Sequence, residues 1–205
     1  MIYEIRTYTL RVGSLNEVEK RFGHAYESRQ KYSPLAGFFH TEVGPLNQIV
    51  HIWPYADQAE RTRIRAEAAK DSNWPPKIQE FIVNQDVQIV HPFAFAPDWK
   101  PGKTGPIYEL RQYHFQPGTL PAIQKAWEEA LPGRIKLSPI NLLGNVEYGP
   151  ANSFIHLWSY PTLEQRTSVR DKSREAGTWP PKGGADHYLS QQNKIMLPSA
   201  FSPAQ

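Results

Sequence analysis

Histidine, arginine, glutamate and aromatic residues alternate with apolar ones along several short segments of this 205-residue chain. In an extended segment every second side chain points to the same face. Glu4, Arg6 and Tyr8 therefore share one face of their segment, and His51 and Trp53 share one face of another. A histidine can act as a general base or an axial metal ligand, and an arginine can hold a carboxylate or an oxyanion. Together these residue types are typical of a small-molecule site.

Each of these residues has a counterpart 105 positions later in the chain, as Glu4 has in Glu109. We predict that the two sets line the interior of a barrel, where the histidines and arginines orient a ligand and the aromatic rings stack on it. The predicted ligand-binding residues are Glu4, Arg6, Tyr8, Glu42, His51, Trp53, Glu109, Arg111, Tyr113, Glu147, His156 and Trp158. Catalytic roles are not assigned to any of them.

A purely structural interpretation of the same residues stays open. A buried Glu4–Arg6 pair can simply neutralise itself, and His51 can be a hydrogen-bonded core histidine. Trp53 can be a packing residue, because large aromatic side chains dominate protein cores. Arg61, on a following helix, can pair with a neighbouring carboxylate. On this interpretation the shared residues build the interface between the two copies.

The elements that position these residues are duplicated along the chain. Ile2–Tyr8 returns as Ile107–Tyr113, and the offset of 105 holds without insertion until close to Gly183. A stretch rich in proline, glycine and polar residues separates the copies and is typical of a linker. The predicted organisation is a first unit at 1–97, a linker at 98–106 and a second unit at 107–205.

Each unit is predicted to follow the order β-α-β-β-α-β. In the first unit Ser14 is expected to cap the first helix, with Glu17 as its capping-box partner, and Asp57 to cap the second. The expected strands are 2–11, 36–43, 47–54 and 86–91, and the expected helices run from Ser14 to about Lys31 and over 58–70. This order is that of the ferredoxin-like split βαβ unit, an α+β fold. Two such units can cover each other's bare sheet faces by closing into a pseudo-dimeric α/β barrel.

Several separated motifs resemble those of the NIPSNAP family, within the dimeric α/β-barrel superfamily. They are Tyr3-Glu4-Ile5-Arg6-Thr7-Tyr8-Thr9-Leu10 followed by Gly13, then Gly44 to Trp53 with Tyr55, then Arg61 and Trp74, and the second copy repeats them. The resemblance implies the barrel fold. Animal members of the NIPSNAP family are associated with mitochondria and vesicle traffic. Other families on the same barrel include cofactor-free monooxygenases, haem-degrading enzymes and chlorite-dismutase relatives.

Our preferred function is a small-molecule-binding barrel of unassigned activity, with an apolar, aromatic or porphyrin-like ligand. A non-enzymatic assembly or adaptor protein and a cofactor-free monooxygenase are the alternatives. An adaptor would have a filled interior, and changing His51 would abolish its folding rather than its binding. Whether the chain is an enzyme is left open.

Composition removes several other classes. The chain has no cysteine, which excludes disulfide scaffolds, thiolate nucleophiles and Cys-ligated metals. The net charge is +3 and the charges are interspersed, so nucleic-acid binding has little support. No apolar run is long enough to span a bilayer. We predict a cytoplasmic homo-oligomer without a metal site, in which no cofactor is required but haem is possible.

Overall fold

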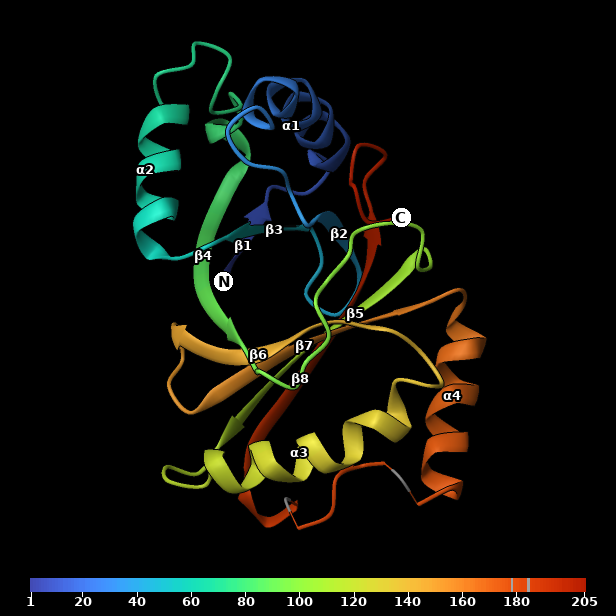
Figure 1. Ribbon diagram of the computed structural model, residues 1–205. Coiled ribbons are helices and arrows are strands. Elements are labelled where there is room, and N and C mark those ends of the chain that lie inside the picture. The colour runs from blue at the N-terminus through green and yellow to red at the C-terminus, as the bar shows by residue number, and fades with distance from the viewer. Residues whose placement is uncertain (178, 184) are drawn as a thin grey trace.

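The computed structural model describes residues 1–177, 179–183 and 185–205. The first unit folds in the predicted order, with a short 3-10 turn η1 before its last strand (Figure 1). Its elements are β1 (Ile2–Leu10), α1 (Leu15–Arg29), β2 (Gly37–Val43), β3 (Gln48–Tyr55), α2 (Gln58–Ala68), η1 (Gln79–Phe81) and β4 (Ile82–Pro92). The second unit consists of β5 (Ile107–Phe115), α3 (Leu120–Arg134), β6 (Ile140–Tyr148), β7 (Ser153–Tyr160), α4 (Leu163–Glu175), η2 (Ala185–His187) and β8 (Tyr188–Pro198).

The strands of both units form one closed barrel in the order β1-β3-β2-β8-β5-β7-β6-β4. All neighbouring strands are antiparallel, and the units meet at β2–β8 and β4–β6. Each unit alone would leave two open sheet edges, and closing the barrel pairs both. The prediction of two ferredoxin-like units forming a pseudo-dimeric α/β barrel is therefore confirmed. The two pairs of helices lie outside the barrel, at the top and bottom of Figure 1.

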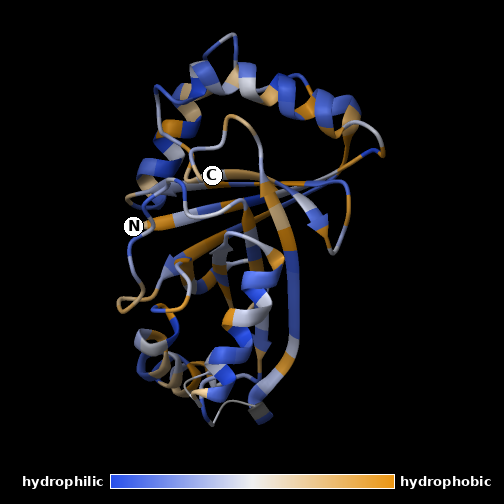
Figure 2. Cartoon of the chain, turned by 90° about the vertical axis from the view of Figure 1, so that its right-hand side faces the viewer, coloured by the Kyte–Doolittle hydropathy of each residue, from blue (hydrophilic) through white to orange (hydrophobic). Residues whose placement is uncertain are grey.

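The barrel interior is an apolar core to which both units contribute. Ile5, Phe39, Ile52, Leu110 and Leu157 belong to one buried cluster, and Figure 2 shows orange strand segments running through the middle of the molecule. A second cluster packs between the first sheet and its helices, and a third does so in the second unit. Both faces of each sheet are thus buried, one inside the barrel and the other under helices.

The placement of the candidate residues inside the barrel is wrong. Tyr8 and Trp53 pack in the cluster under the helices, whereas Ile5, Val50 and Ile52, on the opposite faces of the same strands, fill the barrel. The barrel interior takes aliphatic and aromatic side chains alike, since Phe39 and Tyr108 meet there at a ring-centroid distance of 4.6 Å. The faces that carry Glu4, Arg6 and His51 lie instead between the sheet and its helices, where the arginines of α1 and α2 can reach them.

Helix caps and strand lengths differ from the prediction in details. Asp57 caps α2 as expected, since its Oδ1 accepts a hydrogen bond of 2.8 Å from the Glu60 backbone N–H. Ser14 precedes α1 but has helical backbone angles, so its Oγ donates to the Arg11 carbonyl oxygen at 2.7 Å and the capping box does not form. The fourth strand is longer than the predicted 86–91. Within the described part of the chain, no helix combines the length and apolarity needed to cross a membrane.

Candidate functional site

A cavity of about 490 Å³ lies between the outer face of the first sheet and the elements that cover it. Its lining residues come from β1, β3, β4, both helices and the segment after α2, and they are Arg6, Tyr8, Phe22, Arg29, His51, Trp53, Tyr55, Arg65, Ala69, Trp74, Pro75, Pro76, Ile78, Gln79, Ile82 and Gln85. Four predicted residues, Arg6, Tyr8, His51 and Trp53, are therefore brought together in one cavity. The Trp74–Pro76 segment forms a wall of this cavity.

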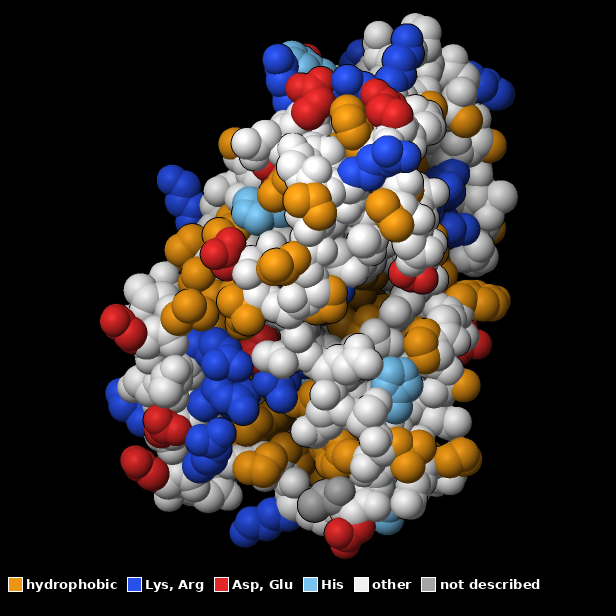
Figure 3. Space-filling model, turned by 180° about the vertical axis from the view of Figure 1, so that it is seen from behind, with side chains coloured by type: hydrophobic (Ala, Val, Ile, Leu, Met, Phe, Trp, Pro, Cys, Tyr) orange, Lys and Arg blue, Asp and Glu red, His pale blue; other side chains and the backbone are white. Residues whose placement is uncertain are grey.

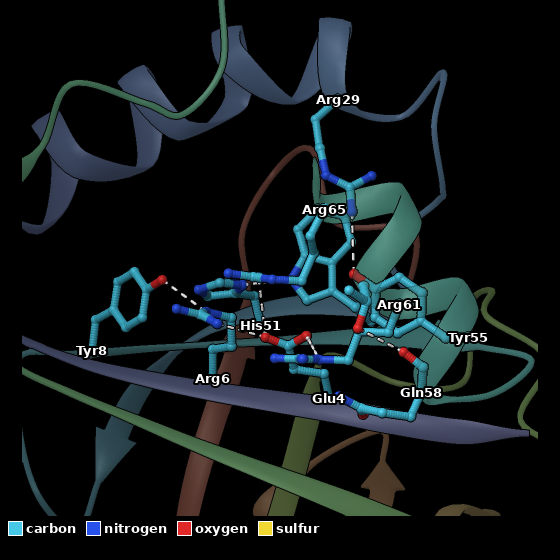
Figure 4. A network of polar contacts seen from close by, with 11 residues as sticks. Glu4, Arg6, Tyr8, Arg29, His51, Tyr55, Gln58, Arg61 and Arg65 are labelled. Atoms are coloured by element: carbon cyan, nitrogen blue, oxygen red, sulfur yellow. Dashed lines mark hydrogen bonds and ion pairs between the residues drawn. The ribbon is translucent and has the colours of Figure 1, made fainter. Parts of the chain in front are cut away.

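Glu4 lies beside this cavity as a fully buried carboxylate (Figure 4). Its Oε1 accepts hydrogen bonds from Arg6 Nη1 at 2.5 Å and Arg65 Nη1 at 3.2 Å, and its Oε2 accepts one from Arg61 Nε at 2.6 Å. Burial alone would raise the pKa of Glu4, but the hydrogen bond from Arg61 and the charges of Arg65 and Arg6 outweigh it and lower the pKa. Glu4 therefore stays ionised and fixes three arginines around the cavity.

His51 is a neutral hydrogen-bond donor rather than a base. Burial, reinforced by the charge of Arg6, holds the pKa of His51 well below its ordinary value. Trp53 Nε1 donates to His51 Nδ1 at 2.7 Å, so the single proton of the neutral ring lies on Nε2. This buried Nε2–H has no hydrogen-bond partner among the described residues. The role of general base, which a histidine can take in other settings, is incompatible with that tautomer, because a protonated Nε2 cannot accept a proton.

The same tautomer decides whether His51 could ligate haem, the cofactor that the sequence left possible. An axial histidine binds iron through an unprotonated ring nitrogen. In His51 one nitrogen accepts the indole N–H and the other carries the proton, and the ring is packed against Phe22 and Phe38 at centroid distances of 5.0 and 5.6 Å. The residues therefore do not fit haem ligation by His51.

The three histidines His40, His51 and His156 are expected to titrate differently. The hydrogen bond from His40 to Glu19, at 2.8 Å, raises the pKa of His40, whereas burial lowers the pKa of the other two. In an NMR titration from pH 5 to 8, the His40 ring signals should shift with a midpoint above the ordinary value of about 6.5. The His51 and His156 signals should stay those of neutral rings, and protonation of either above pH 6 would contradict the assignment.

Sequence reasoning missed Arg29, which is as buried as His51. Its Nη1 donates to Ser33 Oγ at 2.9 Å and its Nη2 to Tyr55 Oη at 3.2 Å, and its guanidinium stacks 4.4 Å from the centroid of the Trp53 ring. No carboxylate lies within ion-pair distance of it in the described part of the chain. A signal was available, because arginine recurs at position 134, 105 residues later.

The second unit repeats this arrangement. Glu109 is fully buried and accepts hydrogen bonds of 2.6 Å from both Arg111 and Arg166, and Trp158 Nε1 donates to His156 Nδ1 at 2.6 Å. Figure 3 shows Lys and Arg side chains gathered beside a hollow with hydrophobic walls in this half of the molecule. Two wall positions are bulkier than in the first unit: Trp127 stands at the position of Phe22, and Tyr188 at that of Ile82.

Glu42 and Glu147 do not join either set. Both are exposed near the ends of β2 and β6, because these strands run past the helices into their hairpin turns. The barrel itself has a separate hollow of about 600 Å³ at one end, lined by side chains of both units, including Gln48, Gln112 and Lys194. None of the predicted ligand-binding residues lines it.

The eight-stranded antiparallel barrel with helices outside is the architecture of the dimeric α/β-barrel proteins. A solved structure from Lactobacillus acidophilus NCFM, provisionally named a monooxygenase, superimposes on this chain with a TM-score of 0.71. The superposition covers 97% of this chain and 94% of the other. Its sequence identity of 12% shows a shared fold alone.

The family model for NIPSNAP matches residues 3–97 and again 108–203, and the chain belongs to this family. NipSnap homolog 3B of Mus musculus is 30% identical over 210 residues, covering 98% of this chain and 85% of the relative. NipSnap homolog 3A of Homo sapiens is 29% identical over 215 residues, covering 99% and 85%.

Proposed function

We propose that this NIPSNAP protein binds a small molecule with an aromatic or apolar body, and that the cavity of its first unit is the binding site. The observation that carries the proposal is the unpartnered Nε2–H of His51 in the wall of a cavity of about 490 Å³. A buried donor without an acceptor costs about 1–3 kcal/mol, and a ligand acceptor atom would recover this free energy. The cavity volume lies within the range of small-molecule sites.

The cavity walls support an aromatic or apolar ligand. The rings of Tyr8, Phe22, Trp53 and Trp74 face the cavity, and Phe22 and Trp74 are packed edge to face at 5.5 Å. Such rings offer large contact areas and favour stacked or edge-on contact with a second aromatic system. In this proposal Trp53 has two tasks: it contributes a wall, and its indole N–H fixes the His51 tautomer.

The assembly alternative predicts a filled interior, whereas the barrel has a hollow of about 600 Å³ whose lining includes Ile5, Leu110 and Ile155. The cavity of the first unit lies outside the barrel, under the helices. Closing the barrel neither creates nor fills it. A site under the helices can therefore coexist with residues that hold the fold together. The predicted homo-oligomer and cytoplasmic location stay predictions.

Blocking the cavity from its rim tests the proposal. Ala69 lines the cavity yet is exposed at the end of α2, so Ala69→Trp should close the entrance at little cost in stability. Ala66→Trp is a matched control, since Ala66 is exposed on the same helix and does not line the cavity. Native mass spectrometry of freshly purified protein should show a retained small mass in wild type and in Ala66→Trp.

Ala69→Trp should lose that mass from the first unit while remaining folded. A mass retained equally by both variants, or no retained mass in the wild type, would count against the cavity as the site. Denaturation before the measurement should release the mass from every variant.

A further inference from the structure

We propose that the ligand of the first unit's cavity is an organic acid, an aromatic or apolar molecule whose carboxylate or equivalent oxyanion lies between Arg29 and Arg65. This inference rests on the proposed function and specifies the ligand class of the same cavity. Arg29 descends from α1 and Arg65 extends from α2, and Figure 4 shows both above the sheet that carries Glu4, Arg6 and His51.

Arg29 has hydrogen-bond donors to spare. A guanidinium carries five N–H groups. Two groups on Nη1 are used by the carbonyl oxygen and Oγ of Ser33, and one on Nη2 by the hydroxyl of Tyr55. No described residue accepts a hydrogen bond from its Nε–H or from its second Nη2–H. An oxyanion is the partner that unused guanidinium N–H groups in a cavity wall fit.

The partners of Arg29 are also electrically neutral. Serine and tyrosine hydroxyls satisfy hydrogen bonds but carry no opposite charge, and Glu4, which favours the charged form of Arg29, is outside ion-pair distance. Arg29 and Arg65 line the same cavity (Figure 4). Burial lowers the pKa of Arg29, and the like charge of Arg65 lowers it further. Holding like charges together in a buried site costs free energy that an anion would remove.

Counting the charges around the cavity leads to the same ligand class. Arg6, Arg29 and Arg65 line the cavity, and Arg61 lies beside it. One buried carboxylate, that of Glu4, pairs with Arg6, Arg61 and Arg65. Glu4 can balance one of them, so the surroundings keep a surplus of positive charge. The aromatic walls and the His51 N–H then hold the uncharged part of the ligand. A neutral ligand would leave this surplus uncompensated.

A pair of fluorescent probes that share their rings separates charge from shape. 8-Anilinonaphthalene-1-sulfonate carries a sulfonate, and N-phenyl-1-naphthylamine has the same rings without it. Titrations of wild-type protein should give the sulfonate about ten- to hundredfold tighter binding, the worth of one charge-assisted hydrogen-bonded contact. Raising the salt concentration should weaken binding of the sulfonate and leave binding of the neutral probe nearly unchanged.

Arginine variants locate the charge preference. Arg65→Met removes a partly exposed side chain and should fold normally, while Arg29→Met removes the buried one. Each should erase most of the preference for the sulfonate at the first unit, leaving binding of the neutral probe intact. Arg63→Met is the control, because Arg63 is exposed on α2 and pairs with Glu67 away from the cavity. Its preference should match that of the wild type.

The outcomes separate this inference from the proposed function. If both probes bind equally, and Ala69→Trp removes one site for each, the cavity binds small molecules but the anion inference is wrong. If Ala69→Trp changes the binding of neither probe, the cavity is not the site and the proposed function fails. A sulfonate preference that survives Arg65→Met and Arg29→Met in folded protein also overturns the inference.

Discussion

Glu4→Gln is expected to lower the free energy of unfolding by about 3–5 kcal/mol, because it breaks a buried ion network by removing its single carboxylate. Arg6 and Arg61 have side chains only 14% and 17% exposed, and both keep their charge when Glu4 becomes neutral. The glutamine amide keeps the shape and some hydrogen bonds, so the loss reports mainly the uncompensated charge.

Urea unfolding at pH 7 measures this effect. The midpoint should fall with little change in slope, since the variant removes an interaction without altering the surface exposed on unfolding. Glu42→Gln is the matched control, because Glu42 is exposed on β2, and it should stay within about 0.5 kcal/mol of the wild type. A loss below about 1 kcal/mol for Glu4→Gln would mean that the network adds little to stability.

The second large effect is a loss of stability in acid that originates at Glu109. Burial would raise the pKa of Glu109, but the hydrogen bond from Arg166 and the charge of Arg111 outweigh it and lower the pKa to about 2, from a reference of 4.5. A carboxylate with a lowered pKa stabilises the fold at every pH above its unfolded-state value. That stabilisation is lost as the pH falls from about 4.5 towards 2, and at 1.36 kcal/mol per pKa unit it amounts to about 3 kcal/mol.

Comparing the wild type with Glu109→Gln isolates this contribution. Chemical unfolding at a series of pH values should give a difference in stability that is constant above pH 5 and shrinks below it. The difference should be near its minimum at pH 2, where the wild-type carboxyl is itself becoming neutral. A difference that does not change between pH 7 and pH 2 would show that Glu109 titrates at the same pH in the folded and unfolded chain.

The amino-acid sequence by itself determined the duplicated α+β unit and the closed barrel. These features follow from local patterns: alternation in strands such as Ile2–Leu10, the Asp57 cap, and a repeat offset that stays constant. A ferredoxin-like unit with one uncovered face and two open edges has few ways to bury them, so the duplication led to the barrel.

Which sheet face points inward was decided only by the tertiary structure. Alternation sorts Glu4, Arg6 and Tyr8 from Ile5 and Thr7, but both faces are buried here, and the pattern does not say what covers each one. A face with ionisable side chains suggested an interior site, whereas packing put the uncharged face inside, because two opposing sheets leave no room to pair buried charges. The face with Glu4 and Arg6 lies under the helices instead, where Arg61 and Arg65 of α2 reach Glu4.

The cavity likewise required the fold. Arg29 comes from α1, Arg65 from α2 and His51 from β3, and their separations along the chain give no sign that they meet. The tautomer of His51 depends on the indole of Trp53 two residues away, a contact that strand alternation allows but does not specify. The sequence identified most of the residues that line this cavity from β1 and β3. Long-range packing decided that α1 and α2 lie over these residues and bring Arg29 and Arg65 to the cavity.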